Sequence, residues 1–82
     1  MDRRMITRQF VEGLLRKKGD LDPFGDSESL ILSGRLESID AVEIVMFIEN
    51  QFGVDFSAVG FDQGLIDSIE LIVRLVQGHA PA

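Results

Sequence analysis

The chain has 82 residues, a length that fits one small domain with a single modest core. Apolar residues make up 45% of it and charged residues 27%, which is typical of a folded globular protein and excludes a disordered one. The absence of cysteine excludes disulfides and thiolate metal sites and favours a reducing, cytoplasmic compartment. Because no long apolar segment is present, we expect neither a secretory signal nor stable membrane insertion.

The net charge of −6 is unevenly distributed along the chain. Six of the eight basic residues lie in residues 1–20, whereas residues 36–73 contain no lysine or arginine. An acidic half repels the phosphate backbone of nucleic acids and attracts proteins that carry a basic patch. We therefore expect no nucleic-acid partner. Acids that only keep the protein soluble are the alternative interpretation.

Residues 2–17 have apolar side chains every three to four positions, which predicts a first helix with one buried stripe. Gly19 is its expected end, and the basic residues just before Gly19 favour the negative end of the helix dipole. Residues 20–37 then form a long connection that glycine and proline interrupt. We expect its apolar residues to hold it to the core: Leu30, Ile31, Leu32 and Leu36. A strand at residues 30–32 is the competing interpretation, but it has no partner strand.

A second helix is predicted over residues 38–52, with Gly53 as its end. A short helical turn is expected near residues 61–65 and a last helix over residues 67–78, where Asp67 and Glu70 have the spacing of a capping box. Residues 79–82 are expected to form a flexible tail. The chain is thus predicted to be a single all-α domain over residues 1–82, a bundle of three main helices and one short helix.

The second helix has two apolar faces when its residues are projected at about 100° intervals. One is the core stripe, formed by Ala41, Ile44, Val45, Ile48 and Phe52. The other lies nearly opposite and carries Ile39, Val42 and Met46 beside acidic residues. Either the helix is central and wrapped on all sides, or this second stripe is exposed and docks a partner.

Residues 33–53, SGRLESIDAVEIVMFIENQFG, closely resemble the modification segment of acyl carrier proteins. That family has an acid-Ser-Leu/Ile signature at the start of its second helix, and Glu37-Ser38-Ile39 matches it with Glu where Asp is usual. The order of helices and loops is similar over most of the chain. The resemblance implies a 4′-phosphopantetheine arm on Ser38, whose thiol holds acyl groups as thioesters.

The resemblance further implies a monomeric carrier, not an enzyme, that serves fatty acid, lipid or specialised acyl metabolism. A phosphopantetheinyl transferase would attach the arm, and acyl-loading and acyl-processing enzymes with basic patches would recognise the carrier. The resemblance places their contacts on the second helix and the residue before it: Glu37, Ile39, Asp40, Val42, Glu43, Met46 and Glu49.

A second serine, in Asp67-Ser68-Ile69, matches the family signature more literally than Ser38 does. Too little chain follows it to build the rest of a bundle, so we interpret Asp67 and Ser68 as caps of the last helix. Capping alone is also the alternative interpretation of Ser38.

Two other functions are compatible with the sequence. Residues 33–38, SGRLES, look like the entry of carriers for aminoacyl, D-alanyl or peptidyl groups. A cavity lined by phenylalanine and isoleucine, with Phe47 as a candidate, would favour a fatty acyl cargo, and a solid core would favour the aminoacyl type. A non-covalent module that docks a partner helix needs no modification. Because His79 is the single histidine, we expect no catalytic triad and no histidine-rich metal site.

Overall fold

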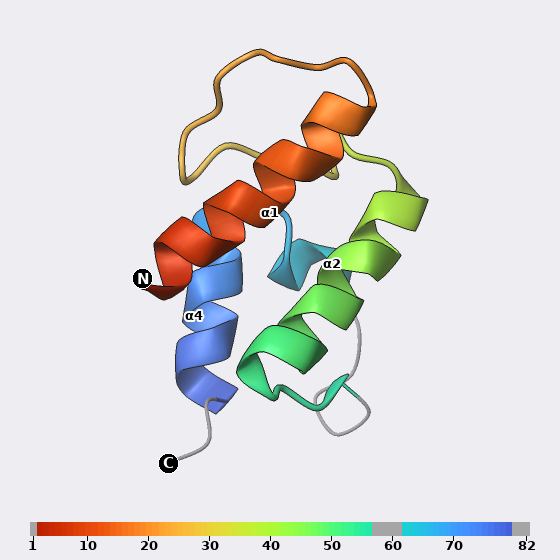
Figure 1. The fold of residues 1–82 in the computed structure, drawn as a ribbon. Helices are drawn as coiled ribbons and strands as arrows, with labels where there is room; N and C mark the ends of the chain where they lie inside the picture. Colours follow the sequence, from red (N-terminus) through yellow and green to blue (C-terminus); the bar gives the residue numbers. More distant parts are fainter. Residues whose placement is uncertain (1, 57–61, 80–82) are drawn as a thin grey trace.

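Three α-helices and a 3-10 turn form the fold, seen in a computed structural model that describes residues 2–56 and 62–79. The elements are α1 (Arg3–Lys17), α2 (Ser38–Phe52), η1 (Gln63–Leu65) and α4 (Ile69–His79). α1 crosses the front of the molecule in Figure 1 and packs against α4, while α2 runs down the other side. The long connection from α1 to α2 arches over the top of the helices (Figure 1). The predicted all-α fold is confirmed.

α1 is closed at both ends by hydrogen bonds to its free backbone groups. At its start, the Asp2 carboxylate accepts a hydrogen bond from the N–H of Met5 at 2.8 Å. At its end, the N–H of Asp20 donates to the carbonyl of Leu15 at 2.9 Å. Gly19 between them has a φ of 81°, a conformation that glycine adopts without steric cost. The predicted end of this helix is confirmed, and its start lies one residue later than expected.

The core lies between the helices and the long loop. Its buried apolar residues are Val11, Leu14 and Leu15 on α1, Ala41, Ile44 and Ile48 on α2, Ile69, Ile72, Val73, Leu75 and Val76 on α4, and Phe24, Leu30, Ile31, Leu36, Val54, Phe56 and Ile66 outside these three helices. Removal of these side chains from water is the main driving force for the fold. The expectation that Leu32 also anchors the loop is wrong, because its side chain is 69% exposed.

The apolar run at residues 30–32 is part of a turn, so the competing strand interpretation is wrong. Asp67 holds this turn from the other end of the chain. Its carboxylate oxygen Oδ1 accepts hydrogen bonds from the N–H groups of Ile31 and Leu32, each at 2.8 Å. Its main-chain carbonyl accepts a third from the N–H of Leu30, also at 2.8 Å. The loop is therefore fixed to the segment that precedes α4.

α4 begins with a cap from Ser68, whose hydroxyl accepts a hydrogen bond from the N–H of Leu71 at 3.2 Å. The predicted role of Ser68 is thereby confirmed. The predicted capping box of Asp67 and Glu70 is wrong, because the Asp67 carboxylate is used by the loop. The Glu70 carboxylate instead pairs with Arg74 one turn later, at 2.8 Å.

The remaining predicted elements are present where the structure describes them, but α4 begins at Ile69, two residues later than predicted, and includes His79, which the prediction placed in the tail. Gly53, with a φ of 73°, ends α2 as expected. The expected turn near residues 61–65 is present as η1, although residue 61 lies outside the described residues. α4 continues to His79, and residues 80–82 of the expected tail also lie outside them. In the described part of the chain, no helix has the length and apolar character needed to span a membrane.

Candidate functional site at the start of α2

Ser38 is the first helical residue of α2, and it is exposed to solvent. The N-cap is the residue before it, Glu37, whose backbone is extended. The interpretation in which Ser38 only caps the helix is therefore wrong. Within residues 2–56 and 62–79, no side chain or backbone group forms a hydrogen bond with the Ser38 hydroxyl. This hydroxyl is thus open to an incoming group.

The start of α2 is electrostatically suited to a phosphate. The N–H groups of the first helical turn have no partner within the helix, and the helix dipole places partial positive charge at this end. A phosphodiester on Ser38 would meet both, so the residues present fit a phosphopantetheine attachment. The negative charge of Glu37, the residue directly before the serine, opposes the binding of a phosphate here. Its side chain is 68% exposed.

Arg35 fixes the loop that leads into this site. Its Nε and Nη2 atoms donate to the two carboxylate oxygens of Asp20 at 3.1 and 3.0 Å, and Nη1 donates to Glu28 at 2.7 Å. The same guanidinium also donates to two main-chain carbonyls of the loop. Hydrogen bonds to Asp20 and Glu28 raise the pKa of Arg35, and the Arg35 hydrogen bond lowers the pKa of Asp20.

Leu36, between Arg35 and Glu37, is buried in the core with only 2% of its surface exposed. Its N–H donates to the carbonyl of Leu30 at 2.8 Å. Its two neighbours are less buried, since Arg35 is half-buried and Glu37 is exposed. Of the three residues before the serine, Arg35 is thus held by the loop and Leu36 by the core. Glu37 is held by a cation at the end of α1.

That cation is Lys18, which bridges two carboxylates at the start of α2. Its ammonium nitrogen lies 3.0 Å from Glu37 Oε2 and 2.8 Å from Asp40 Oδ2. The same Asp40 oxygen accepts a hydrogen bond from the N–H of Glu37 at 2.8 Å. Asp40 therefore closes the first turn of α2, while Lys18 joins this turn to the end of α1.

Charge and burial act against each other at Asp40. Burial raises the pKa of its carboxyl, but hydrogen bonds from Lys18 and from the N–H of Glu37 lower it by more, so the net pKa is below its usual range. The pKa of Lys18 is raised by its hydrogen bonds to Asp40 and Glu37. The Lys18–Asp40 pair therefore stays charged through the neutral pH range.

An exposed apolar strip extends from Ser38 along α2. The side chains of Ile39, Val42 and Met46 are 68%, 54% and 55% exposed. A helix wrapped on all sides is thereby excluded, and the second apolar face is on the surface. Glu43 and Glu49 are also exposed, whereas Asp40 is buried and faces Lys18 instead of the surface.

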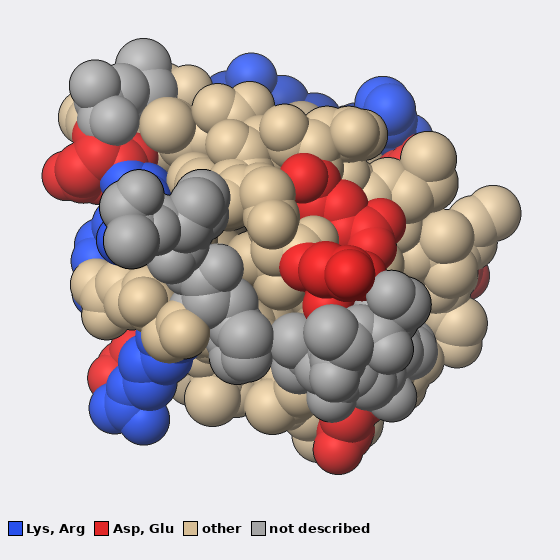
Figure 2. Space-filling view, turned by 90° about the horizontal axis from the view of Figure 1, so that it is seen from below, with Lys and Arg blue, Asp and Glu red and all other residues tan. Residues whose placement is uncertain are grey.

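The surface around the end of α2 is acidic. Figure 2, which views the molecule from the end where α2 and α4 finish, shows acidic side chains gathered on one side and basic ones at the edges. α2 itself contributes Glu43 and Glu49 to this surface and contains no lysine or arginine. The apolar strip is thus bordered by negative charge.

Ser68, the serine with the more literal signature, is not accessible. Only 4% of its surface is exposed, and its hydroxyl caps α4. The preceding Asp67 is 6% exposed and engaged by the loop. The two acid-Ser-Ile sequences of this chain are therefore distinguished by burial.

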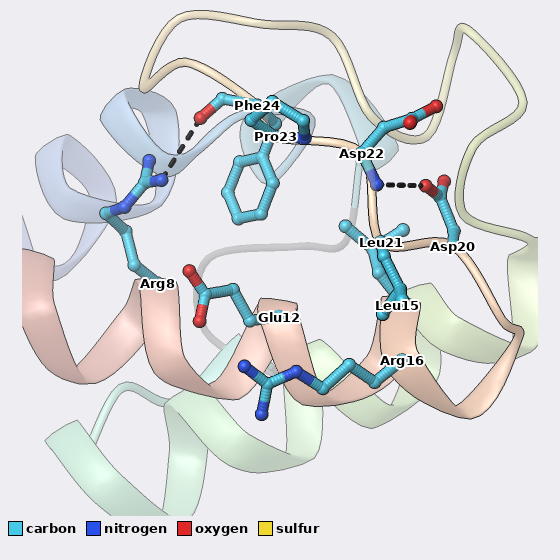
Figure 3. A pocket seen from close by; sticks show the side chains of 9 residues that line it. All are labelled: Arg8, Glu12, Leu15, Arg16, Asp20, Leu21, Asp22, Pro23 and Phe24. Carbon is cyan, nitrogen blue, oxygen red and sulfur yellow. Dashed lines mark hydrogen bonds between the residues drawn. The ribbon is translucent and has the colours of Figure 1, made fainter.

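Two cavities among the described residues lie along α1, away from the apolar strip. One, of about 340 Å³, opens between α1 and residues 20–24. Figure 3 shows Arg8 beside it, donating to the carbonyl of Phe24 at 3.1 Å, with Glu12 and Arg16 on the same helix. The second lies between the start of α1 and α4. Charged side chains line both cavities, so neither resembles a pocket for an alkyl chain.

Phe47, the candidate cavity residue, lines neither of these cavities. Its ring stacks on Phe10 of α1 with the ring centroids 4.1 Å apart and meets Phe52 edge-on at 5.7 Å. Such ring pairs contribute beyond the area that they bury. Phe47 therefore joins α1 to α2 within the packed part of the molecule.

The sequence did not reveal two of the residues that shape this site. Lys18 was interpreted only through the helix dipole, and Arg35 had no assigned role. Their partners are 15 to 22 positions away, at Asp20, Glu37 and Asp40, and no local pattern encodes such pairs. Among the described residues, no group of three or more His, Asp or Glu side chains could hold a metal ion.

A scan against protein-family models, a search of curated proteins and a search of solved structures each found no match to this chain.

Proposed function

We propose that this protein is an acyl-carrier-type protein in which Ser38 carries a 4′-phosphopantetheine arm. The observation that carries the proposal is the contrast between the two acid-Ser-Ile sequences. Ser38 is exposed at the start of a 15-residue helix and heads an apolar, acid-bordered strip. Ser68 is buried. The resemblance of residues 33–53 to the modification segment of acyl carrier proteins supports the same assignment.

The chain's own residues present the hydroxyl and do not activate it. The charged groups that surround the start of α2, Lys18, Glu37 and Asp40, are paired with each other. A phosphopantetheinyl transferase therefore supplies the base that takes the serine proton. The serine oxygen bonds to the phosphorus of coenzyme A that bears the pantetheine, and adenosine 3′,5′-bisphosphate leaves. The attached arm supplies a thiol that holds acyl groups as thioesters.

The exposed strip is the surface on which partner enzymes would dock. Ile39, Val42 and Met46 offer apolar area, and methionine adapts its shape to different partners. Glu43 and Glu49 would attract basic patches and speed the encounter. These roles make the protein a cosubstrate of other enzymes and not an enzyme itself.

The packing of Phe47 favours one class of cargo over another. A fatty acyl chain that entered the molecule beside Phe47 would have to separate its ring from Phe10 and Phe52. An aminoacyl, D-alanyl or peptidyl group can stay outside on its arm. The ring contacts therefore favour this second type of carrier over a carrier that encloses fatty acyl chains.

Intact mass spectrometry tests the proposal. The purified apo-protein is incubated with coenzyme A and a broad-specificity phosphopantetheinyl transferase. We expect the mass of one phosphopantetheinyl group to be added to wild type and to Ser68→Ala, and nothing to be added to Ser38→Ala. The Ser68 variant is the matched control, because it also loses one serine hydroxyl after an acidic residue. Wild type that stays unmodified would contradict the proposal and leave a non-covalent docking module as the function.

A further inference from the structure

We infer that Lys18 is a positioning residue for the modification of Ser38, an inference that rests on the proposed function. Lys18 holds the carboxylate of Glu37 against α1 and offsets its charge. An incoming phosphate then meets the positive start of α2 instead of an unpaired carboxylate. The geometry behind this is the bridge from Lys18 to Glu37 and Asp40, at 3.0 and 2.8 Å.

The backbone of Lys18 is fixed, so the position of its side chain is reproducible. Lys18 is the C-cap of α1, and its N–H donates to the carbonyl of Leu15 at 3.0 Å. The next two residues, Gly19 and Asp20, donate to Arg16 and again to Leu15, each at 2.9 Å. This pattern is a Schellman motif, which rigidly ends a helix. The ammonium group of Lys18 is therefore attached to a rigid part of the backbone.

The site needs a cation from outside α2. Residues 36–73 contain no lysine or arginine, and Arg35, the cation nearest to Ser38 in sequence, is paired with Asp20 and Glu28. The Lys18 side chain is 26% exposed and the Asp40 side chain 10%, so their pair is partly shielded from solvent. Such shielding makes the attraction less sensitive to salt than a pair on the open surface. Lys17, in contrast, forms no ion pair with a described residue.

Phosphoryl donors are anions, and their approach depends on the local field. Without Lys18, the exposed carboxylate of Glu37, the residue before the serine, would lose its ion-pair partner. The N–H of Glu37 would still bond to Asp40 at 2.8 Å, so the helix would remain while its first turn loosened. We therefore expect the loss of Lys18 to slow the transfer step and to leave the protein folded.

The test compares Lys18→Met with Lys17→Met as apo-protein substrates of the transferase. Both variants lose one positive charge, so any change in long-range attraction to a basic enzyme is shared. With both substrates saturating, we expect kcat for Lys18→Met to be about three- to fivefold lower than for Lys17→Met. Amide hydrogen exchange at residues 38–40 should also be faster in Lys18→Met, a readout independent of the transferase.

Glu37→Gln shows whether Lys18 acts through Glu37. This variant keeps the Lys18–Asp40 pair, so it should remain folded. We expect Lys18→Met to reduce kcat by less than twofold in the Glu37→Gln background, as coupled residues do in a double-mutant cycle. Equal kcat for the two lysine variants, or an undiminished effect in the Gln background, overturns the inference but leaves the proposed function intact. Failure to modify wild type overturns the proposed function itself.

Discussion

Asp67 offers the sharpest test of how the loop before the site is held. One oxygen of its buried carboxylate accepts the N–H groups of Ile31 and Leu32 at 2.8 Å each. Asp67→Ala removes this acceptor oxygen and leaves two backbone donors without partners. Asp67→Asn keeps a neutral oxygen in the same place, so it separates the loss of the hydrogen bonds from the loss of charge.

The magnitude follows from these two hydrogen bonds. An unsatisfied donor in a buried position costs about 1–3 kcal/mol, so Asp67→Ala should lower the free energy of unfolding by about 3 kcal/mol. For a domain of this length, that is a large share of the about 4–12 kcal/mol that is typical. Asp67→Asn should cost about 1 kcal/mol, because neutral hydrogen bonds are roughly half as strong as charged ones.

The sign of the pH dependence is also fixed by the structure. Burial raises the pKa of Asp67, but hydrogen bonds from Ser29 and from the N–H groups of Leu32 and Ile31 lower it by more. A native pKa below the unfolded value of about 4 means that folding favours the charged form. The stabilisation is present above about pH 4 and is lost as pH falls through the native pKa. The difference between wild type and Asp67→Asn should therefore shrink as pH falls below about 5.

Urea denaturation followed by circular dichroism measures these values, since the chain has no tryptophan or tyrosine to serve as a fluorescent probe. Asp22→Ala is the control, because Asp22 is exposed in the same loop system and should change stability by less than about 0.5 kcal/mol. A loss below about 1 kcal/mol for Asp67→Ala would refute the reasoning. So would a difference between wild type and Asp67→Asn that does not change with pH.

The remaining predictions concern the helices. Gly13→Ala should stabilise the protein by about 0.5–1 kcal/mol, because Gly13 lies inside α1 and an added Cβ meets nothing within 4 Å. Gly19→Ala should destabilise the protein by about 1 kcal/mol, since the φ of 81° at Gly19 strains any other residue. Thermal melting should show a higher melting temperature for Gly13→Ala and a lower one for Gly19→Ala. Ile48→Ala should cost about 2–5 kcal/mol because Ile48 is fully buried. Met46→Ala should leave the urea midpoint unchanged and weaken only the coupling to a partner enzyme; a destabilisation above about 1 kcal/mol would place Met46 in the core.

Much of the fold could be predicted because its signals are local. The bounds of α2 follow from an apolar run that begins after an acid-Ser pair and stops at Gly53, and the structure has the same bounds. Gly19 and Gly53 both adopt the positive φ that only glycine adopts readily. The C-terminal ends of α1 and α2 could therefore be predicted from the positions of these glycines in the sequence. The helical period also separated Ile44 and Ile48 from Val42 and Met46, on opposite faces of one helix.

The errors arose where a residue had two possible partners. Asp67 lies just before α4 and could cap it, and a local sequence pattern predicts only that role. The folded chain brings the N–H groups of Ile31 and Leu32 to it from 36 and 35 positions away, and they take its carboxylate. Leu32 is exposed for a related reason, because the turn held by Asp67 directs it away from the core.

The sequence by itself determined the three helices, the bounds of α2 and its two apolar faces, because short-range periodicity and glycine conformation encode them. Only the tertiary structure decided which of two similar serines is accessible. Burial depends on how distant segments pack, and packing encloses Ser68 while Ser38 stays open. The structure also decided that Lys18 reaches Glu37 and Asp40, since that bridge exists only once the end of α1 is placed beside the start of α2.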